Sequence, residues 1–259
     1  MSPGSPGGRN GVTATFVLVP GAGGQAWYWH RLVPELERRG AAAVPVELPA
    51  GDDSAGLERY TQTVLEALDG ARAGPLVVVG QLMGGFTAPL VCHATRVDLL
   101  VLLNAMVPRP GESGGEWWTA TGQPQAREEA AREHGRPFDP EDLDDVVTHD
   151  VPPEVLATGP TDFAQSGTPF TEPWPLDRWP DVPTRVLAGR DDRFFPLAFQ
   201  RRIAAERLGL PVDEVPGGHL VALSRPADLA DRLVAYLDES GSGWRTTAGR
   251  PSSPAQEVP

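Results

Sequence analysis

Two ionisable side chains in the second half of the chain have the setting of an acid–base pair. Asp192 lies in "AGRDDRFFP" (188–196), directly after an apolar run of strand type. His219 lies in "PGGHLVAL" (216–223), after two glycines and another expected strand. A carboxylate beside an imidazole orients the ring and makes it a competent general base. Taken singly, a turn carboxylate and a structural histidine are the more ordinary interpretations, so the pair gains weight only in combination with other features.

A sharp corner is expected within "VVVGQLMGGFTAPLV" (77–91), where an apolar strand ends and a helix begins. Gly80 and Gly84 flank Leu82, which is the frame of a nucleophile elbow, where the central residue is normally serine. Leucine has no proton to give and no lone pair, and its branched tip would fill space that a substrate needs. The left-handed corner costs a non-glycine residue about 1–2 kcal/mol. Because leucine gains nothing catalytic from that strain, we expect the corner to have relaxed.

A glycine-rich loop follows the first expected strand, in "VLVPGAGG" (17–24). Backbone N–H groups in such a loop can stabilise a developing oxyanion better than side chains that must reorganise. A glycine-rich turn alone is weak support for a site. The spacing G-x-G-x-x-G is absent, so the loop does not indicate a dinucleotide site.

Composition limits the possible partners of the chain. The 259 residues carry a formal net charge of −13, which makes nucleic acid an unexpected partner because phosphate binding needs a basic face. Cys92 is the only cysteine, so neither a disulfide within the chain nor a cysteine metal site is expected. We find no signal peptide, membrane-spanning run, phosphate loop or metal motif. A cytoplasmic protein that needs no cofactor and binds no membrane is therefore expected.

Strands and helices alternate along most of the chain, which predicts an α/β fold with a mostly parallel sheet and helices on both faces. Strands are expected over 13–20, 42–49, 75–80, 97–105, 184–189 and 211–215. Helices are expected over 29–39, from Leu57 to Leu68 with Ser54 as the cap, over 84–93 and 197–208, and from Pro226 onward. The expected domain spans 12–238, between disordered tails at 1–11 and 239–259.

The periodicity fades from about 106 to 182, where we expect a small helical lid because so long a structureless loop is implausible. Four of the seven tryptophans lie in this insertion. They could line a ligand pocket or pack the lid onto the core, and the sequence does not decide between these roles. Trp117 and Trp118 are the candidates for contact with an apolar substrate.

Taken together, the order oxyanion loop, elbow, acid and histidine resembles that of the α/β-hydrolase superfamily, within the esterase, methyl esterase and hydroxynitrile lyase-like group. The resemblance is carried by "FVLVPGAGGQAWYWHRLVPEL", "VVVGQLMGGFTAPLV", "VLAGRDDRFFP" and "GGHLVALSRP" and covers about 13–238. It implies that Asp192 is the acid, that His219 is the base, and that the N–H groups of Ala22 and Met83 form the oxyanion hole. Leu82 falls on the nucleophile position.

One departure from the family pattern is Pro20, which replaces the histidine that many members carry before the oxyanion glycine.

Three functions remain open from the sequence. The first is non-covalent general-base chemistry by His219 and Asp192 on a small, apolar carbonyl or ester compound. The second is a catalytically silent variant, natural or engineered, of a serine esterase. The third is a pseudoenzyme that binds a ligand or partner. Substrate identity and oligomeric state are not indicated.

Overall fold

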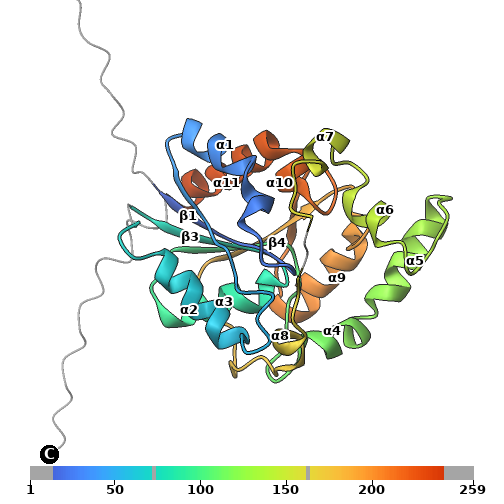
Figure 1. The fold of residues 1–259 in the computed structure, drawn as a ribbon, viewed down its shortest axis with the longest axis horizontal. Helices are drawn as coiled ribbons and strands as arrows, with labels where there is room; N and C mark the ends of the chain where they lie inside the picture. Colours follow the sequence, from blue (N-terminus) through green and yellow to red (C-terminus); the bar gives the residue numbers. More distant parts are fainter. Residues whose placement is uncertain (1–13, 72–73, 162–163, 242–259) are drawn as a thin grey trace, which may run out of the picture.

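The computed structural model describes residues 14–71, 74–161 and 164–241, which form one sheet covered by helices on both faces (Figure 1). The expected tail at 1–11 and the end of the second tail, from 242, lie outside the described residues. The last helix continues to Gly241, three residues beyond the predicted domain end at 238.

The sheet has six parallel strands in the order β2-β1-β3-β4-β5-β6. This confirms the predicted fold class. The strands are β1 (Thr15–Val19), β2 (Ala42–Pro45), β3 (Leu76–Leu82), β4 (Leu99–Ala105), β5 (Thr184–Gly189) and β6 (Val212–Val215).

Alternate side chains of each strand point to opposite faces and create two apolar cores. In β3, Val78 joins the core on one face, whereas Val77 and Val79 join the other. The first core is covered by α2 (Leu57–Ala67), α3 (Gly84–Ala94) and α9 (Leu197–Leu208). The second is covered by η1 (Ala26–Trp29), α1 (Leu32–Arg38), α10 (Val221–Ser224) and α11 (Pro226–Gly241). Burial on both sides explains why β3 and β4 are almost continuously apolar.

The lid insertion between β4 and β5 forms several helices on one side of the molecule (Figure 1). They are α4 (Gly114–Thr121), α5 (Gln123–Glu133), α6 (Leu143–Thr148), α7 (Pro153–Leu156) and α8 (Thr168–Thr171). Helix α4 starts with a capping box, in which Ser113 and Glu116 each bond the other's backbone N–H. A buried ion pair between Arg207 of α9 and Glu112 fixes the start of the lid to the core.

Two local predictions were wrong. Ser54 does not cap α2, because Gly56 occupies the N-cap position and Ser54 bonds the carboxylate of Asp52 instead. The helix predicted over 29–39 is shorter: it starts at Leu32, and a separate 3-10 turn covers Ala26–Trp29.

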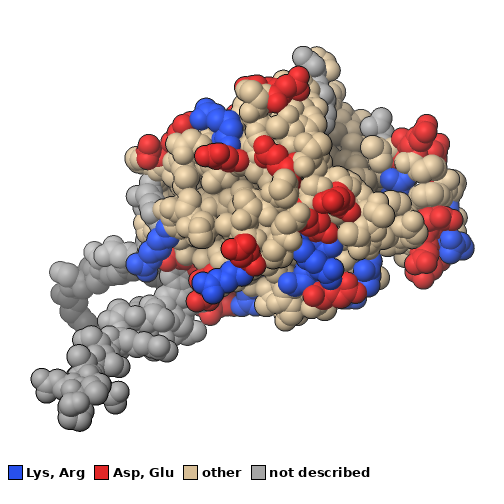
Figure 2. All heavy atoms as spheres, turned by 90° about the horizontal axis from the view of Figure 1, so that it is seen from below, with Lys and Arg blue, Asp and Glu red and all other residues tan. Residues whose placement is uncertain are grey.

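Acidic and basic side chains lie beside one another on the face shown in Figure 2. Among the described residues, many of the arginines pair with a neighbouring carboxylate. Within the described residues, no helix has both the length and the apolar character needed to cross a bilayer.

Candidate active site

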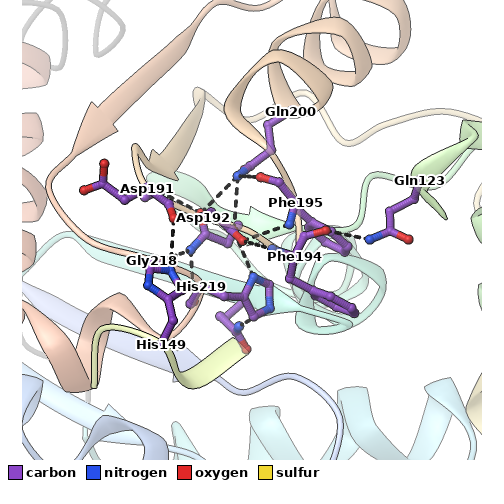
Figure 3. Close-up of polar contacts among 12 residues, drawn as sticks. Gln123, His149, Asp191, Asp192, Phe194, Phe195, Gln200, Gly218 and His219 are labelled. Atoms are coloured by element: carbon purple, nitrogen blue, oxygen red, sulfur yellow. Dashed lines mark hydrogen bonds and ion pairs between the residues drawn. The ribbon is translucent and has the colours of Figure 1, made fainter. Parts of the chain in front are cut away.

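Asp192 and His219 come together at the carboxyl ends of β5 and β6. Nδ1 of His219 lies 2.9 Å from Oδ2 of Asp192, and both side chains are almost fully buried (Figure 3). A carboxylate can only accept here, so Nδ1 carries the hydrogen and Nε2 of the neutral ring is left as an acceptor. The rings of Phe194 and Phe195 meet the imidazole edge-on, with centroids 5.0 and 5.3 Å away. The contact expected from the sequence is therefore present.

The carboxylate of Asp192 is itself held by three further groups. Oδ1 accepts from the backbone N–H groups of Phe194 and Phe195, each at 2.8 Å, and Oδ2 lies 3.4 Å from Nε2 of Gln200 (Figure 3). Through the first two bonds, the Asp192 side chain stabilises the turn in which it lies. Gln200 was not among the residues predicted for the site, although its position on the buried face of α9 is a signal that could have found it.

Asn104, also missed, ties the strand ends around the site together. Its Nδ2 donates to the carbonyls of Gly218 and His219 at 3.2 and 3.0 Å, and its Oδ1 accepts from Gly189 N–H at 2.8 Å. Asn104 has φ 43° and is skipped where β3 changes register against β4. A single amide inside the apolar run "LLVLLNA" was the sequence signal for this role.

Leu82 lies at the corner between β3 and α3, where φ is 47°. The expectation that the corner has relaxed is therefore wrong, since this is left-handed backbone that leucine rarely adopts. The surrounding packing holds it there: a Cβ on Gly80 would lie 2.6 Å from the carbonyl oxygen of Gly84. A Cβ on Gly84 would lie 2.8 Å from the carbonyl oxygen of Val19. The flanking glycines are thus required for the close approach of strand and helix, as the sequence predicted.

The glycine-rich loop lies directly against the corner. A Cβ on Gly21 would lie 2.7 Å from Cβ of Leu82. Gly23 N–H donates to Oε1 of Gln165, a lid residue, at 2.7 Å. Among the described residues, no group accepts a hydrogen bond from the N–H of Ala22 or of Met83. The oxyanion-hole role that the resemblance assigned to these two N–H groups stays a prediction.

The two candidate tryptophans of the lid differ in burial. Trp117 is fully buried, its Nε1 donates to the carbonyl of Val107 at 3.1 Å, and its ring packs 5.3 Å from that of Phe195. Those contacts favour a packing role for Trp117. Trp118 is only half-buried, and its ring lies 5.8 Å from that of Phe194, which in turn contacts His219. Trp118 is thus the better placed of the two to meet a ligand.

The lid also contacts the loop that carries His219. Oδ2 of Asp150 accepts from Gly218 N–H at 2.6 Å, and Nε2 of His149 lies 3.1 Å from the carbonyl oxygen of Asp191 (Figure 3). Both residues lie between α6 and α7, far in sequence from the loops they contact. Neither residue was predicted from the sequence to lie near the site.

A cavity of about 360 Å³ opens between the lid and Arg193, and none of the predicted site residues lines it. Its lining residues are Arg127, Ala131, Arg136, Pro137, Phe138, Asp139, Asp142, Val146 and Arg193. In the part of the chain that the structure describes, no three metal-binding side chains cluster together.

This strand order, with an acid and a histidine after the last two strands and a strained corner after β3, defines an α/β-hydrolase. The chain belongs to the alpha/beta hydrolase family, whose family model matches residues 16–232. Among curated proteins, the probable esterase PIR7A of Oryza sativa subsp. indica is 26% identical over 251 residues, covering 85% of this chain and 95% of the relative.

A second curated relative is the alpha-hydroxynitrile lyase of Arabidopsis thaliana, 32% identical over 103 residues, which cover 36% of this chain and 40% of the relative. Among solved structures, a pyrethroid hydrolase from Sphingobium faniae JZ-2 matches with a TM-score of 0.70 and 24% identity, covering 89% of this chain and 100% of the other. The structural match supports the fold.

Proposed function

We propose that this chain is a family member without a serine nucleophile, in which His219 and Asp192 act as a general base on a small, apolar carbonyl or ester compound. The observation that carries the proposal is the 2.9 Å contact between Nδ1 of His219 and Oδ2 of Asp192, retained beside a corner occupied by Leu82. Covalent catalysis needs a nucleophilic atom at that corner, whereas proton abstraction needs only the oriented imidazole.

Two reaction types fit this arrangement. In the first, Nε2 of His219 takes a proton from water as the water oxygen bonds to an ester carbonyl carbon. The carbonyl electron pair moves to the oxygen, which the N–H groups of Ala22 and Met83 hold. Collapse of this intermediate expels the alkoxide, which takes the proton back from Nε2.

In the second, Nε2 takes a proton from a carbon acid or a hydroxyl. For a carbon acid, the C–H electron pair moves into an enolate whose oxygen bonds the same two N–H groups. For a hydroxyl whose carbon also carries a carbon leaving group, the O–H electron pair forms the carbonyl double bond. The carbon–carbon bond breaks at the same time, and its electron pair leaves with the departing carbon. In both cases His219 then returns the proton to product.

The names of the relatives suggest which compounds to test. An esterase and a hydroxynitrile lyase are both similar to this chain, and a pyrethroid hydrolase shares its fold. A suitable panel contains a p-nitrophenyl ester, a methyl ester, an apolar pyrethroid ester and an aromatic α-hydroxynitrile. The half-buried Trp118 and Phe194 beside His219 favour compounds with an apolar or aromatic body.

The test compares the unaltered chain with His219→Ala on this panel. We expect turnover of one member of the panel, and its loss by about 100-fold or more in His219→Ala. His134→Ala is the matched control, because His134 is an exposed lid histidine that bonds only a helix carbonyl, and it should leave turnover unchanged. Turnover that survives His219→Ala would contradict the proposal.

A silent serine esterase is the second candidate, and the retained left-handed corner favours it. At φ 47° the backbone of residue 82 already has the left-handed conformation of an elbow, with the flanking glycines in place. Leu82→Ser should then restore labelling by a fluorophosphonate and cleavage of short p-nitrophenyl esters. A folded Leu82→Ser protein that neither labels nor cleaves would count against this candidate.

A binding protein would behave differently from both. Its ligand affinity would be unaffected by His219→Ala and would fall in Trp118→Ala, which a titration of the two variants distinguishes.

A further inference from the structure

Nε2 of His219, the atom that must take a proton in either reaction, already has a partner. Nε2 of Gln81 lies 3.3 Å from it, and the Gln81 side chain is 3% exposed. Gln81 is the last residue before Leu82 on β3. Its amide therefore lies where the hydroxyl of a nucleophile at the corner would have to lie to reach the imidazole.

The hydrogen bonding of the imidazole decides the direction of this contact. Asp192 fixes the hydrogen on Nδ1, so Nε2 offers a lone pair. An amide NH₂ group can only donate, and Gln81 therefore donates to Nε2. The opposite amide orientation would place a carbonyl oxygen against a lone pair, unless the ring carried a second proton.

The two ends of the Gln81 amide have different surroundings, which agree with this orientation. Its Oε1 points toward the glycine-rich loop, where a Cβ on Gly21 would lie 2.6 Å from it. The backbone of Gln81 is paired with Leu103 of β4, and β3 changes its register against β4 directly after this pair. A buried amide in such a setting keeps its hydrogen bond, because leaving the donor unsatisfied costs more free energy than the bond itself contributes to stability.

We propose that Gln81 is a positioning residue that holds His219 Nε2 as a hydrogen-bond acceptor and occupies it until a substrate displaces the amide. The inference rests on the proposed function in that it takes Nε2 as the reacting atom. It also separates two obstacles to covalent catalysis: Leu82 removes the nucleophile, and Gln81 occupies the base. Restoring serine at position 82 thus repairs only the first.

The direct test is ¹⁵N NMR of the histidine side chains in the unaltered full-length chain and in Gln81→Met. Methionine keeps the length and volume of glutamine but has no donor. We expect the Nε2 resonance of His219 to move downfield, as for a lone pair that has lost its donor, while Nδ1 remains protonated. Gln62→Met, on the exposed face of α2, is the control and should leave both resonances unchanged.

Gln81→Glu provides a second variant in case the methionine substitution perturbs folding. A carboxylate cannot donate, and it favours a protonated Nε2 instead. We therefore expect a second imidazole N–H signal at neutral pH in Gln81→Glu. Two N–H signals in the unaltered chain, or an Nε2 resonance that ignores both variants, would overturn the proposal.

A kinetic experiment tests the same proposal in variants that carry Leu82→Ser. Leu82→Ser/Gln81→Met should react with a fluorophosphonate about fivefold faster than Leu82→Ser, the factor expected for one neutral hydrogen bond that no longer competes. An unchanged or slower rate in the double variant argues against the blocking role. If neither protein labels, the esterase candidate fails, and the NMR result alone decides the role of Gln81.

Discussion

The side chain of Leu82 lies directly against the backbone of Gly21: a Cβ on Gly21 would lie 2.7 Å from Cβ and 3.0 Å from Cδ2 of Leu82. The same added atom would lie 2.6 Å from Oε1 of Gln81. The glycine-rich loop and the corner therefore fit together only because one of them has no side chain at the point of contact. Gln81, which shares this contact, also lies 3.3 Å from Nε2 of His219, so the contact borders the candidate site.

Substitution of Gly21 should reveal how tightly the loop and the corner are packed. We expect Gly21→Ala to lower the free energy of unfolding by about 1–3 kcal/mol, because the new methyl group must displace Leu82 or Gln81. Urea denaturation measures this change. Gly167→Ala is the control, since its φ is −73° and nothing lies within 4 Å of an added Cβ. Equal stability of the two variants would show that the loop moves freely.

Removal of the Asp150 carboxylate should loosen the loop that carries His219. Asp150→Ala leaves the N–H of Gly218 without the acceptor that now lies 2.6 Å away. We expect faster amide hydrogen exchange at Gly218 and its neighbours, corresponding to a loss of about 1–3 kcal/mol of local stability. Asp177→Ala, an exposed lid variant, should leave exchange in this loop unaltered. Unchanged protection in Asp150→Ala would mean that the lid does not support the loop.

Arg207 and Glu112 should couple strongly in stability because their pair is buried. Nη2 of Arg207 lies 3.0 Å from Oε1 of Glu112, with side-chain exposures of 1% and 10%. Arg207→Met leaves a buried carboxylate unpaired, and we expect it to lower the free energy of unfolding by about 3–5 kcal/mol. Arg207→Met/Glu112→Leu should lose less than the sum of the single variants.

The exposed pair of Arg132 and Glu128 offers the contrast in a denaturant titration. Loss of this pair in Arg132→Met should change stability by about 0–1 kcal/mol. If Arg132→Met and Arg207→Met lowered the free energy of unfolding by similar amounts, burial would not explain the strength of the Arg207–Glu112 pair.

Burial raises the pKa of Cys92 to about 12, because the thiolate would be desolvated in the core. At pH 8 we expect iodoacetamide to alkylate the folded chain about three orders of magnitude more slowly than the chain in guanidinium, where the pKa is about 8.5. The protonated thiol therefore stabilises the fold fully below about pH 8.5, and this contribution declines as pH rises toward 12. Mass spectrometry of alkylated Cys92 follows the reaction, and fast modification at pH 8 would contradict its burial.

The order of elements was predictable because each buried strand and amphipathic helix leaves a local pattern. The bounds of β5 and α9 agree with the predicted ranges 184–189 and 197–208. The meeting of Asp192 and His219 followed from topology, since the carboxyl ends of parallel strands share one edge of the sheet. Helix caps were less predictable. Serine is a residue type that often caps helices, but the Ser54 hydroxyl bonds the carboxylate of Asp52 instead of an N–H group at the start of α2.

The bonding partners of the polar groups that support the site were not predictable, because each group acts across the fold. Asn104, Gln165 and Gln200 bond groups that are 85, 142 and 96 residues away in sequence, and no local pattern specifies such partners. The strained corner was misjudged for a related reason. Local conformational energy favours relaxation of Leu82, but the tight packing of Gly80 and Gly84 outweighs it.

The lid holds one backbone N–H on each side of the site, that of Gly23 through Gln165 and that of Gly218 through Asp150. A chimera that carried a relative's insertion in place of 106–182 would strip both loops of their acceptors unless the graft supplied equivalents. The insertion is therefore not an interchangeable module, and any engineering that swaps it must transplant these two anchor points together.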